Sequence, residues 1–499
     1  MAYSYNAPLR DQPFLLPPSI SDWLPETHLV WFVLDVVSMV DTTAFDARHP
    51  NDGVGRPAYD PKMMLALLIY AYCSGIRSSR RIEAACRTDL AFRAICVQLV
   101  PADVTIARFR AEHEAAIKAV FIDVLRLCAR AGLASLGTVA IDGTKIGSDA
   151  ALDANRGEQA IRAEVERIVA EAEAADDQEV PRPTRDDELP EDLARPGSRR
   201  ARLEAALGEI EAQREAAEAA DKRAEAEATQ GRKLRGRKPT EPHAAARRAE
   251  ADVAASKVKA VRAQGLKARQ KAQEELTAAE EAAERARLAA AAAPEPELKA
   301  NTTDPESRIM KTKDAWVQGF NAQAGVNGNQ IVVGNDVTQD HNDVQQLTPM
   351  MEAIMISLAA AGIEEEVGKF LADAGYWSEE NATAEGADRL IATLKDWKQR
   401  KAARDLGTTQ GPPPEDATPL EAMEHRLRTP EGAALYARRS CTVEPIFGQA
   451  KENRNIRRFM RRGLSAAQSE WSFVCTTANV LKLFTHAHGR PLRAVLTTL

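Results

Sequence analysis

Apolar residues recur at three- and four-residue steps through the first part of the chain. The spacing runs through residues 60–76, 78–99 and 104–133, and it is typical of helices that bury one face. Short polar joints separate these three segments, which suits a helix-turn-helix-like unit. We therefore predict a helical, DNA-binding domain over residues 1–137. Three arginines there are candidate contacts for DNA phosphates: Arg80, Arg81 and Arg108. The alternative is a plain helical bundle whose arginines face solvent.

The pattern changes from helix to strand at residue 138. Residues 138–141 form a short apolar run, and Asp142 and Gly143 follow directly. An apolar run of this length that ends in turn residues predicts a core strand. A carboxylate at the end of such a strand is either a turn residue or a ligand of a metal ion. The local sequence leaves both interpretations open.

Residues 150–299 are dominated by Ala, Glu, Arg and Lys, which is the composition of long helices. Two helical segments, 199–229 and 242–292, flank a Gly- and Pro-containing stretch at 231–242. We predict an antiparallel helical hairpin with a basic tip, loosely packed because Ala fills most inward positions. The tip is either a solvated loop or an element that enters a DNA minor groove through Arg235 and Arg237.

Strand patterns return after residue 300. Residues 315–339 predict two strands that turn at Asn327–Asn329, followed by a helix at 343–361. A second apolar segment then ends at an acid, Asp373. Residues 431–486 are mostly helical in pattern. This order predicts a mixed α/β sheet formed by 138–149 and 300–486, with the helical insertion after its first strand and a tail at 487–499.

A third acid, Glu444, is followed by Pro445, a residue favoured in the first turn of a helix. We therefore predict that a helix begins at Glu444. Helical steps from Glu444 lead to Gly448, Lys451, Asn455 and Arg458, so one face would carry an acid and then a cationic track. Such a track fits a phosphate backbone, although a solvated basic face has the same pattern.

The overall composition narrows the class of protein. The chain has 499 residues and a net charge of −7, which argues against a protein that coats nucleic acid uniformly. Its longest apolar runs are too short to span a bilayer, and the N-terminus does not have a secretory pattern, so we expect a cytoplasmic protein. The six cysteines lie far apart without metal-binding spacing, and we expect buried, reduced thiols.

Five motifs, taken in order, resemble the DDE transposases of bacterial insertion sequences. The N-terminal one is "GRPAYDPKMMLALLIYAYCSGIRSSRRIE". The others are "IDGTKI", "DPESRIMKTKDAWVQGFNAQ", "ADAGYWSEEN" and "VEPIFGQAKENRNIRRFMRRGL". The resemblance covers most of the chain outside 150–300. It implies a catalytic domain with a ribonuclease H-like fold.

The resemblance also implies the chemistry. Asp142, Asp373 and Glu444 would be the catalytic, metal-binding acids, holding Mg²⁺ or Mn²⁺, with two ions expected. The substrates would be double-stranded DNA with terminal inverted repeats and target DNA, cut and joined by hydrolysis and transesterification on a homodimer. Seven C-terminal residues would contact this DNA: Arg439, Lys451, Asn455, Arg457, Arg458, Arg461 and Arg462. Four residues separate Arg439 from Glu444 where three are usual in relatives, so Arg438 is an alternative.

Other assignments stay open. Four aspartates are weaker candidates for the acid site, because none combines a strand end with a recognised motif: Asp149, Asp153, Asp336 and Asp343. A catalytically inactive DNA-binding or assembly protein, and a ribonuclease H-like nuclease outside transposition, are the competing functions.

Overall fold

The computed structural model describes residues 20–46, 58–97, 99–176, 196–232, 239, 241–294, 296–312, 315–394 and 407–496. The chain forms two compact units. Residues 1–149 and 307–499 form the first, which we call the body. Residues 150–306 form the second, the insertion. The insertion boundary lies beyond the predicted residue 299, because β3 (Lys299–Asn301) pairs with β2 (Asn155–Gly157) inside the insertion.

The N-terminal part of the body is helical, as its periodicity predicts. The segment 78–99 contains two helices rather than one, because the Asp89 side chain accepts hydrogen bonds from the amides of Ala91 and Phe92 and starts a new helix. The segment 104–133 is likewise divided at His113. The N-terminal helices are η1 (Ile20–Trp23), α1 (Leu29–Met39), α2 (Thr43–Asp46), α3 (Pro61–Cys73), α4 (Ser79–Thr88), α5 (Leu90–Cys96), α6 (Asp103–Glu112) and α7 (Glu114–Arg130).

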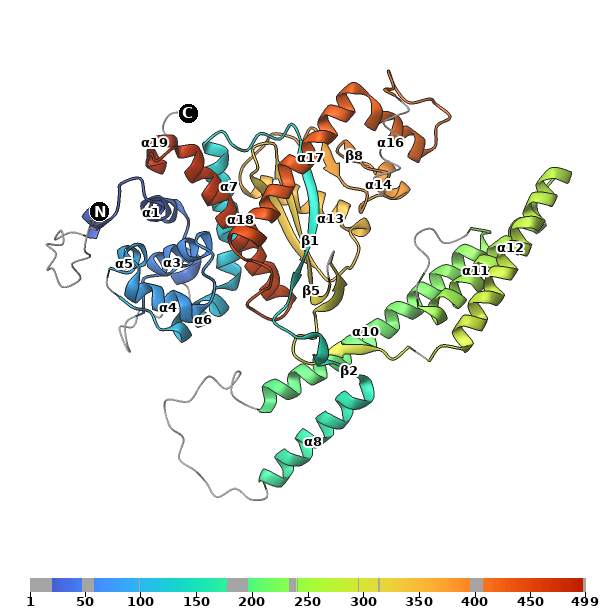
Figure 1. The fold of residues 1–499 in the computed structure, drawn as a ribbon, viewed down its shortest axis with the longest axis horizontal. Helices are drawn as coiled ribbons and strands as arrows, with labels where there is room; N and C mark the ends of the chain where they lie inside the picture. Colours follow the sequence, from blue (N-terminus) through green and yellow to red (C-terminus); the bar gives the residue numbers. More distant parts are fainter. Residues whose placement is uncertain are drawn as a thin grey trace, which may run out of the picture. The chain divides into compact units, whose positions relative to one another are not determined.

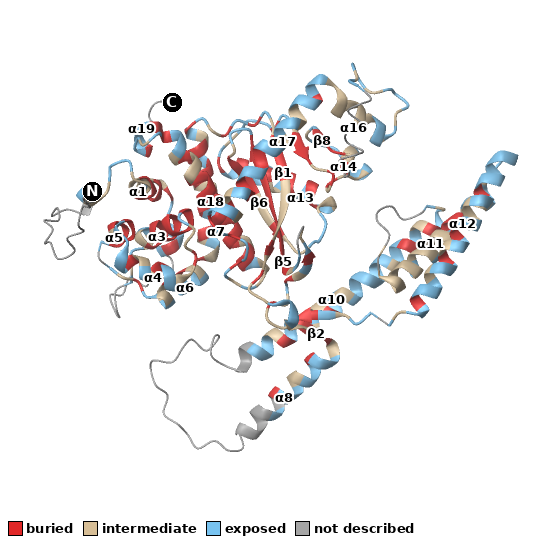
Figure 2. Cartoon of the chain, viewed as in Figure 1, coloured by how far each residue is buried: buried red, intermediate tan, exposed pale blue. Residues whose placement is uncertain are grey.

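The N-terminal helices are not a separate domain that ends at residue 137. Helices α3 and α7 pack against α18 (Leu464–Ala487), and one continuous apolar core runs from the N-terminal helices into the sheet. Every residue from Met64 to Cys73 is buried, which explains why α3 carries an almost unbroken apolar sequence. Figure 2 shows this buried layer extending through the N-terminal helices and the strands.

The body contains one mixed sheet (Figure 1). Its strand order is β4-β5-β1-β7-β8, and β6 also pairs with β5. β1 is antiparallel to β5 and parallel to β7, and β7 is parallel to β8. The turn between β5 and β6 falls at the predicted Asn-Gly-Asn. The strands are β1 (Val139–Gly147), β4 (Arg308–Lys311), β5 (Trp316–Asn327), β6 (Val332–Thr338), β7 (Phe370–Ala372) and β8 (Arg389–Ile391).

Helices cover this sheet. α13 (Leu347–Ala360) packs on β5 and β6, where Gly325 and Gly334 leave room for Ile354; a Cβ on either glycine would lie within 2.5 Å of that side chain. α17 (Pro430–Gly448) packs on β1, β5 and β7, and it lies beside β1 in Figure 1. The remaining elements of the body are η3 (Val344–Gln346), α14 (Glu379–Thr383), α16 (Pro419–Arg428), the π-helical turn η4 (Gln449–Asn453) and α19 (Leu492–Leu496).

The insertion consists mainly of long helices. These are α8 (Glu158–Asp176), α10 (Pro196–Thr229), α11 (Pro242–Arg262) and α12 (Leu266–Ala291), with a short η2 (Leu152–Ala154) before β2. The segment 242–292 was predicted as one helix, but it turns at Gly265, whose φ of +87° favours glycine. The tightest helix pair is therefore α11 with α12. Arg235 and Arg237 lie outside the described residues.

Two further expectations need correction. Cys441 is exposed, whereas the other five cysteines are buried. Pro445 does not begin a helix: α17 starts at Pro430, where the Thr429 hydroxyl accepts a hydrogen bond from the Gly432 amide, and Pro445 falls in its last turn. None of the helices in the described ranges is long and apolar enough to cross a membrane.

Candidate active site

Asp142 and Asp373 meet where two parallel strands lie side by side. The register pairs Ile141 of β1 with Ala372 of β7, so the residue after each is an aspartate. β7 ends at Ala372 but β1 continues to Gly147. We predicted that Asp142 lies at the end of a strand. It lies inside β1 instead. Because its parallel neighbour stops there, Asp142 lies at an open edge beside Asp373.

The surroundings of Asp142 make its charge costly. Burial raises the pKa of Asp142 to about 6; Arg439 opposes this shift, and the negative charge of Asp373 adds to it. Its Oδ1 accepts a hydrogen bond from the Gly143 amide at 2.8 Å, and its Oδ2 accepts one from Arg439 Nη1 at 3.1 Å. A cation placed here would relieve the repulsion between the two aspartates.

Glu444 is linked to Asp142 by a shared ion-pair partner, Arg439. Glu444 and Arg439 both lie on α17, and Arg439 Nη2 is 3.7 Å from Glu444 Oε1 while Nη1 contacts Asp142. The Glu444 side chain is 60 % exposed, but that of Arg439 is only 13 % exposed. One buried guanidinium therefore lies between the first and the third predicted acids.

The predicted helical track beyond Glu444 is not present. α17 ends at Gly448, a π-helical turn follows, and Asn455 has a positive φ of 52°. The irregular segment that follows touches the end of β1, where the Phe459 amide donates to the Gly147 carbonyl at 2.8 Å. Asn455 and Arg458 thus do not share a helical face with Glu444, because the helix stops before them.

Lys451 nevertheless lies next to the acid-bearing strand. Its ammonium donates to Thr144 Oγ1 at 2.5 Å and to the Lys145 carbonyl at 3.1 Å. Thr144 is two residues after Asp142, so it shares a face of β1 with that aspartate. Lys451 is therefore positioned close to the candidate acids.

The basic side chains after Lys451 are engaged within the chain. Arg457 pairs with Glu452, Arg461 with Glu114, and both Arg458 and Arg462 pair with Asp149. Arg457, Arg458 and Arg462 are about half exposed, whereas the Arg461 side chain is only 22 % exposed. Pairs of this exposure exchange partners readily.

Among the N-terminal arginines, Arg80, Arg81 and Arg108 are exposed on α4 and α6. Arg80 makes a 3.4 Å ion pair with Asp103. In contrast, Arg77 is buried and holds Glu470 at 3.1 Å and the Arg458 carbonyl at 2.6 Å. This arginine joins the N-terminal helices to the C-terminal segment.

The sequence placed Asp343 only among the weaker candidates for the acid site, and the polar residues that hold it beneath the acids were missed. Asp343 Oδ1 accepts hydrogen bonds from Asn321 Nδ2 at 2.7 Å and Gln323 Nε2 at 2.9 Å, and Lys145 Nζ lies 3.4 Å away. The buried Tyr376 hydroxyl donates to Gln323 Oε1. Polar residues at alternate positions of an otherwise buried strand, in "FNAQAG", were the available signal.

Three aspartates act on the charge state of Tyr376. Burial raises the pKa of Tyr376 well above its ordinary value, and the charges of Asp343, Asp142 and Asp373 raise it further, in that order. Three carboxylates therefore act on one buried hydroxyl. Tyr376 itself belongs to the core.

The donor set suits a hard divalent cation, since it consists of carboxylate oxygens. Within the described ranges, however, no three His, Cys, Asp or Glu side chains are grouped closely enough to hold a metal ion as they stand. Arg439 lies between Asp142 and Glu444 and supplies the positive charge there. Ion binding by all three acids therefore requires movement of the Arg439 and Glu444 side chains.

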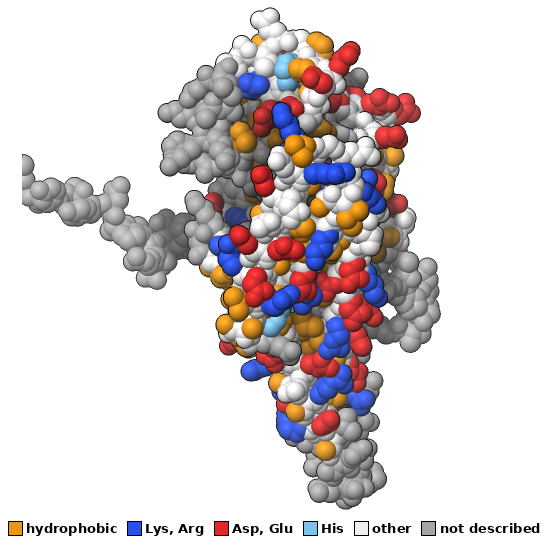
Figure 3. Space-filling model, turned by 90° about the vertical axis from the view of Figure 1, so that its right-hand side faces the viewer, with side chains coloured by type: hydrophobic (Ala, Val, Ile, Leu, Met, Phe, Trp, Pro, Cys, Tyr) orange, Lys and Arg blue, Asp and Glu red, His pale blue; other side chains and the backbone are white. Residues whose placement is uncertain are grey.

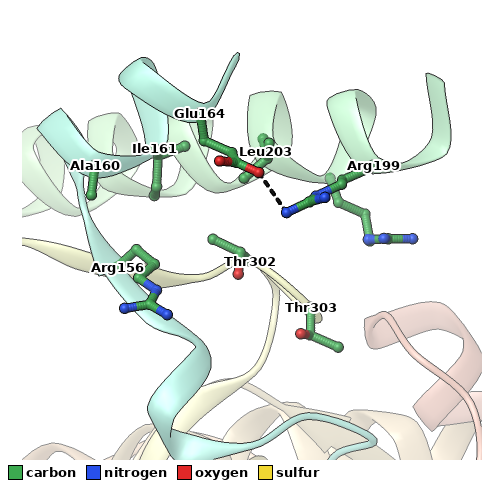
Figure 4. A pocket seen from close by; sticks show the side chains of 9 residues that line it. Arg156, Ala160, Ile161, Glu164, Arg199, Leu203, Thr302 and Thr303 are labelled. Carbon is green, nitrogen blue, oxygen red and sulfur yellow. Dashed lines mark ion pairs between the residues drawn. The ribbon is translucent and has the colours of Figure 1, made fainter. Parts of the chain in front are cut away.

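A cavity of about 450 Å³ lies elsewhere, within the insertion. Figure 4 shows Arg156, Arg199, Glu164, Thr302 and Thr303 around it, with Arg199 paired to Glu164 at 2.5 Å. None of the candidate acids lines this cavity. Figure 3 shows acidic and basic side chains interspersed on the visible face.

Comparison with protein families gives two matches. Residues 18–112 match a family described as a transposase domain (DUF772), and residues 392–484 match one described as a transposase DDE domain. The two matched ranges, each less than half of the chain, support a DDE transposase of the insertion-sequence type, a metal-dependent enzyme that cuts and joins DNA.

The matches also have limits. The second one contains Glu444, Arg439 and Lys451, whereas Asp142 and Asp373 lie outside both matched ranges. No curated protein and no solved structure matches the chain significantly. The assignment of individual site residues therefore depends on the geometry described above.

Proposed function

We propose that Asp142, Asp373 and Glu444 are the catalytic acids of this transposase and that the body has a ribonuclease H-like fold. Three antiparallel strands (β1, β5, β6) followed by two strands parallel to β1 (β7, β8), with the third acid on a later helix, support that fold. One observation supports the site most strongly: Asp142 on β1 lies beside Asp373, which directly follows the parallel strand β7, and Asp142 shares Arg439 with Glu444.

The acids would hold Mg²⁺ or Mn²⁺, with two ions expected. When bound, the ions would activate a water or a DNA 3′-hydroxyl for attack on a phosphodiester and stabilise the leaving oxygen. Asp142 fits this role because its buried charge lacks full compensation in the protein alone. Arg439, which now neutralises two acids, is free to contact phosphate once an ion replaces it.

Lys451 would hold a phosphate beside the cleaved bond, because its ammonium lies on the Thr144 side of β1, the face that carries Asp142. The half-exposed arginines of the C-terminal segment, Arg457, Arg458 and Arg462, would exchange their internal carboxylates for DNA phosphates, with Arg461 and Asn455 nearby. Arg80, Arg81 and Arg108 would contact DNA from the N-terminal helices, which we propose as a DNA-binding region.

We further propose that the substrates are terminal inverted repeats and target DNA, bound by a homodimer. The direct test is a cleavage assay with purified protein, Mg²⁺ and DNA fragments that carry the ends of the element. Asp142→Asn should lower end cleavage by about a thousandfold or more, equivalent to at least about 4 kcal/mol of lost transition-state stabilisation. Asp153→Asn, an exposed acid of the insertion, serves as the matched control and should cleave normally.

Three outcomes would contradict the proposal in different ways. Undiminished cleavage by Asp142→Asn would remove that residue from the site. Cleavage without preference for the ends would favour a nuclease outside transposition. Binding of the ends without cleavage under any metal would indicate a catalytically inactive assembly protein.

A further inference from the structure

Asp343 has one carboxylate oxygen fully engaged and one available. It lies between β6 and η3, and Oδ1 takes all of its hydrogen bonds, from Asn321, Gln323 and Lys145. In the described part of the chain, no donor lies within hydrogen-bond distance of Oδ2. The Asp343 side chain is 24 % exposed.

The available oxygen faces Asp373. A Cβ built on Gly375 would lie 2.8 Å from Asp373 Oδ1 and 3.4 Å from Asp343 Oδ2. The two carboxylates therefore border one small space, which exists because residue 375 has no side chain. Two acids that border a common space repel each other unless a cation is present.

A second feature lies beside the engaged oxygen of Asp343. Asn321 is completely buried, and its Oδ1 has no hydrogen-bond partner. A Cβ on Gly143 would lie 3.0 Å from this oxygen and 2.8 Å from Asp343 Oδ1. A buried carbonyl oxygen without a partner costs about 1–3 kcal/mol. An amide oxygen next to carboxylates is also a normal ligand of hard cations.

These groups lie on the face of β1 opposite to Asp142. Gly143 is the register partner of Gln323, and cross-strand partners share a face, so Asp343 meets β1 on the Gly143 and Lys145 side. Asp142 and Thr144 point to the other side. Asp373, just past the end of β7, is close to both groups.

We propose that Asp343 is a further acidic ligand at the divalent cation site, binding a cation through Oδ2 together with Asp373, on the side of β1 opposite to Asp142. This inference rests on the proposed function, since it assumes that Asp373 binds metal. In this proposal the Lys145 ammonium stabilises the negative charge of Asp343 when no metal is bound. Its positive charge also repels a metal ion, so Lys145 weakens metal binding.

The alternative is that Asp343 only supports the structure by holding Lys145, Asn321 and Gln323. The two roles predict opposite effects at Lys145. If Asp343 binds the metal, Lys145→Met removes a competing positive charge and strengthens metal binding. If Asp343 serves only to anchor Lys145 and the strands, Lys145→Met breaks the same network and weakens metal binding as Asp343→Asn does.

The experiment is a Mn²⁺ titration of the full chain without DNA, with free Mn²⁺ measured by electron paramagnetic resonance. Asp343→Asn should weaken Mn²⁺ binding by about tenfold or more. Asp142→Asn should weaken it as well, and Lys145→Met should strengthen it. The matched control is Asp340→Asn, an exposed acid on the same loop whose carboxylate accepts from Gln346; it should change binding less than about twofold. Circular dichroism and thermal unfolding confirm that each variant is folded.

Each outcome decides a separate question. Normal Mn²⁺ binding by folded Asp343→Asn, with weakened binding by Asp142→Asn, overturns this inference and leaves the proposed function intact. Weakened binding by Lys145→Met overturns it too, and this arm remains decisive if Asp343→Asn fails to fold. A wild-type chain that binds no Mn²⁺ overturns both this inference and the proposed acid site.

Discussion

The body and the insertion are stabilised by different physical means. The chain contains 25 Phe, Tyr and Trp residues, and every one lies outside residues 150–306. The body accordingly has an extensive core with fully buried Trp471, Phe320 and Tyr376. The buried cluster of the insertion is small, with Ile161, Ile168, Leu203, Ala206, Ile210 and Ala300.

One carboxylate from each unit illustrates this difference. In the body, burial raises the pKa of Asp142 to about 6. In the insertion, hydrogen bonds from Arg162 and Arg214 lower the pKa of Glu158, whose side chain is 29 % exposed. Around its candidate site, the body therefore holds a carboxylate whose charged form is disfavoured by burial. On the long helices of the insertion, carboxylates are instead stabilised in their charged form by ion pairs with neighbouring arginines.

The largest expected contrast concerns one ion pair from each unit. Arg77→Met removes the buried pair with Glu470, whose side chain is 1 % exposed, and should destabilise the body by about 3–5 kcal/mol. Lys259→Met removes the 2.7 Å pair with Glu275, in which the side chains are 55 % and 31 % exposed. It should cost less than about 1 kcal/mol.

Urea unfolding measures both variants. Tryptophan fluorescence reports on the body alone, because the insertion has no tryptophan, and circular dichroism at 222 nm reports on helices of both units. Equal losses of stability in the two variants would show that the body does not depend on its buried pair.

The next contrast is in pH dependence. Asp142 must lose its proton to bind metal, so Mn²⁺ affinity should be constant well above pH 6 and fall about tenfold for each pH unit below it. Higher Mn²⁺ concentration should move the midpoint to lower pH, since metal and proton compete. Glu158 has a lowered pKa, so its stabilising pairs are complete above about pH 4.5 and weaken only as pH falls further.

A titration from pH 8 to pH 4 tests this difference, with Mn²⁺ affinity and helix content followed in parallel. At pH 5 the affinity should already be reduced while the helix signal is unchanged. A common midpoint for the two signals would contradict the separation of the two carboxylate environments.

The smallest expected effect follows removal of the insertion. In the body, the Ser148 amide donates to the Gln318 carbonyl at 2.7 Å, and Gln318 Nε2 donates to Ser307 Oγ at 2.8 Å. The two ends of the excised segment therefore lie beside one residue, and a short Gly/Ser linker can join residues 149 and 307. The body should keep its fluorescence-monitored stability to within about 1 kcal/mol. A loss of cooperative unfolding would show that the insertion is part of the body's fold.

Local patterns were sufficient for much of the fold. The helical periodicity of residues 60–133, the turn at Asn327–Asn329 and the Ala-rich character of the insertion each correspond to an observed element. Single residues set the boundaries that pattern analysis missed: Asp89 starts a new helix, and Gly265 ends the continuity of α11 and α12. Pro445 misled because it lies inside α17, near the C-terminal end of that helix, rather than in a first turn.

The sequence by itself determined which residues were capable of the chemistry, because residue type, motif order and local hydrophobic pattern are properties of neighbouring positions. Only the tertiary structure decided which of them meet. Asp142 and Asp373 are 231 positions apart and become neighbours through the register of β1 and β7. Arg439 and Asp343 join them through packing of α17 and hydrogen bonds to β5. Such contacts depend on burial and pairing across the whole body, which no local stretch of the chain encodes.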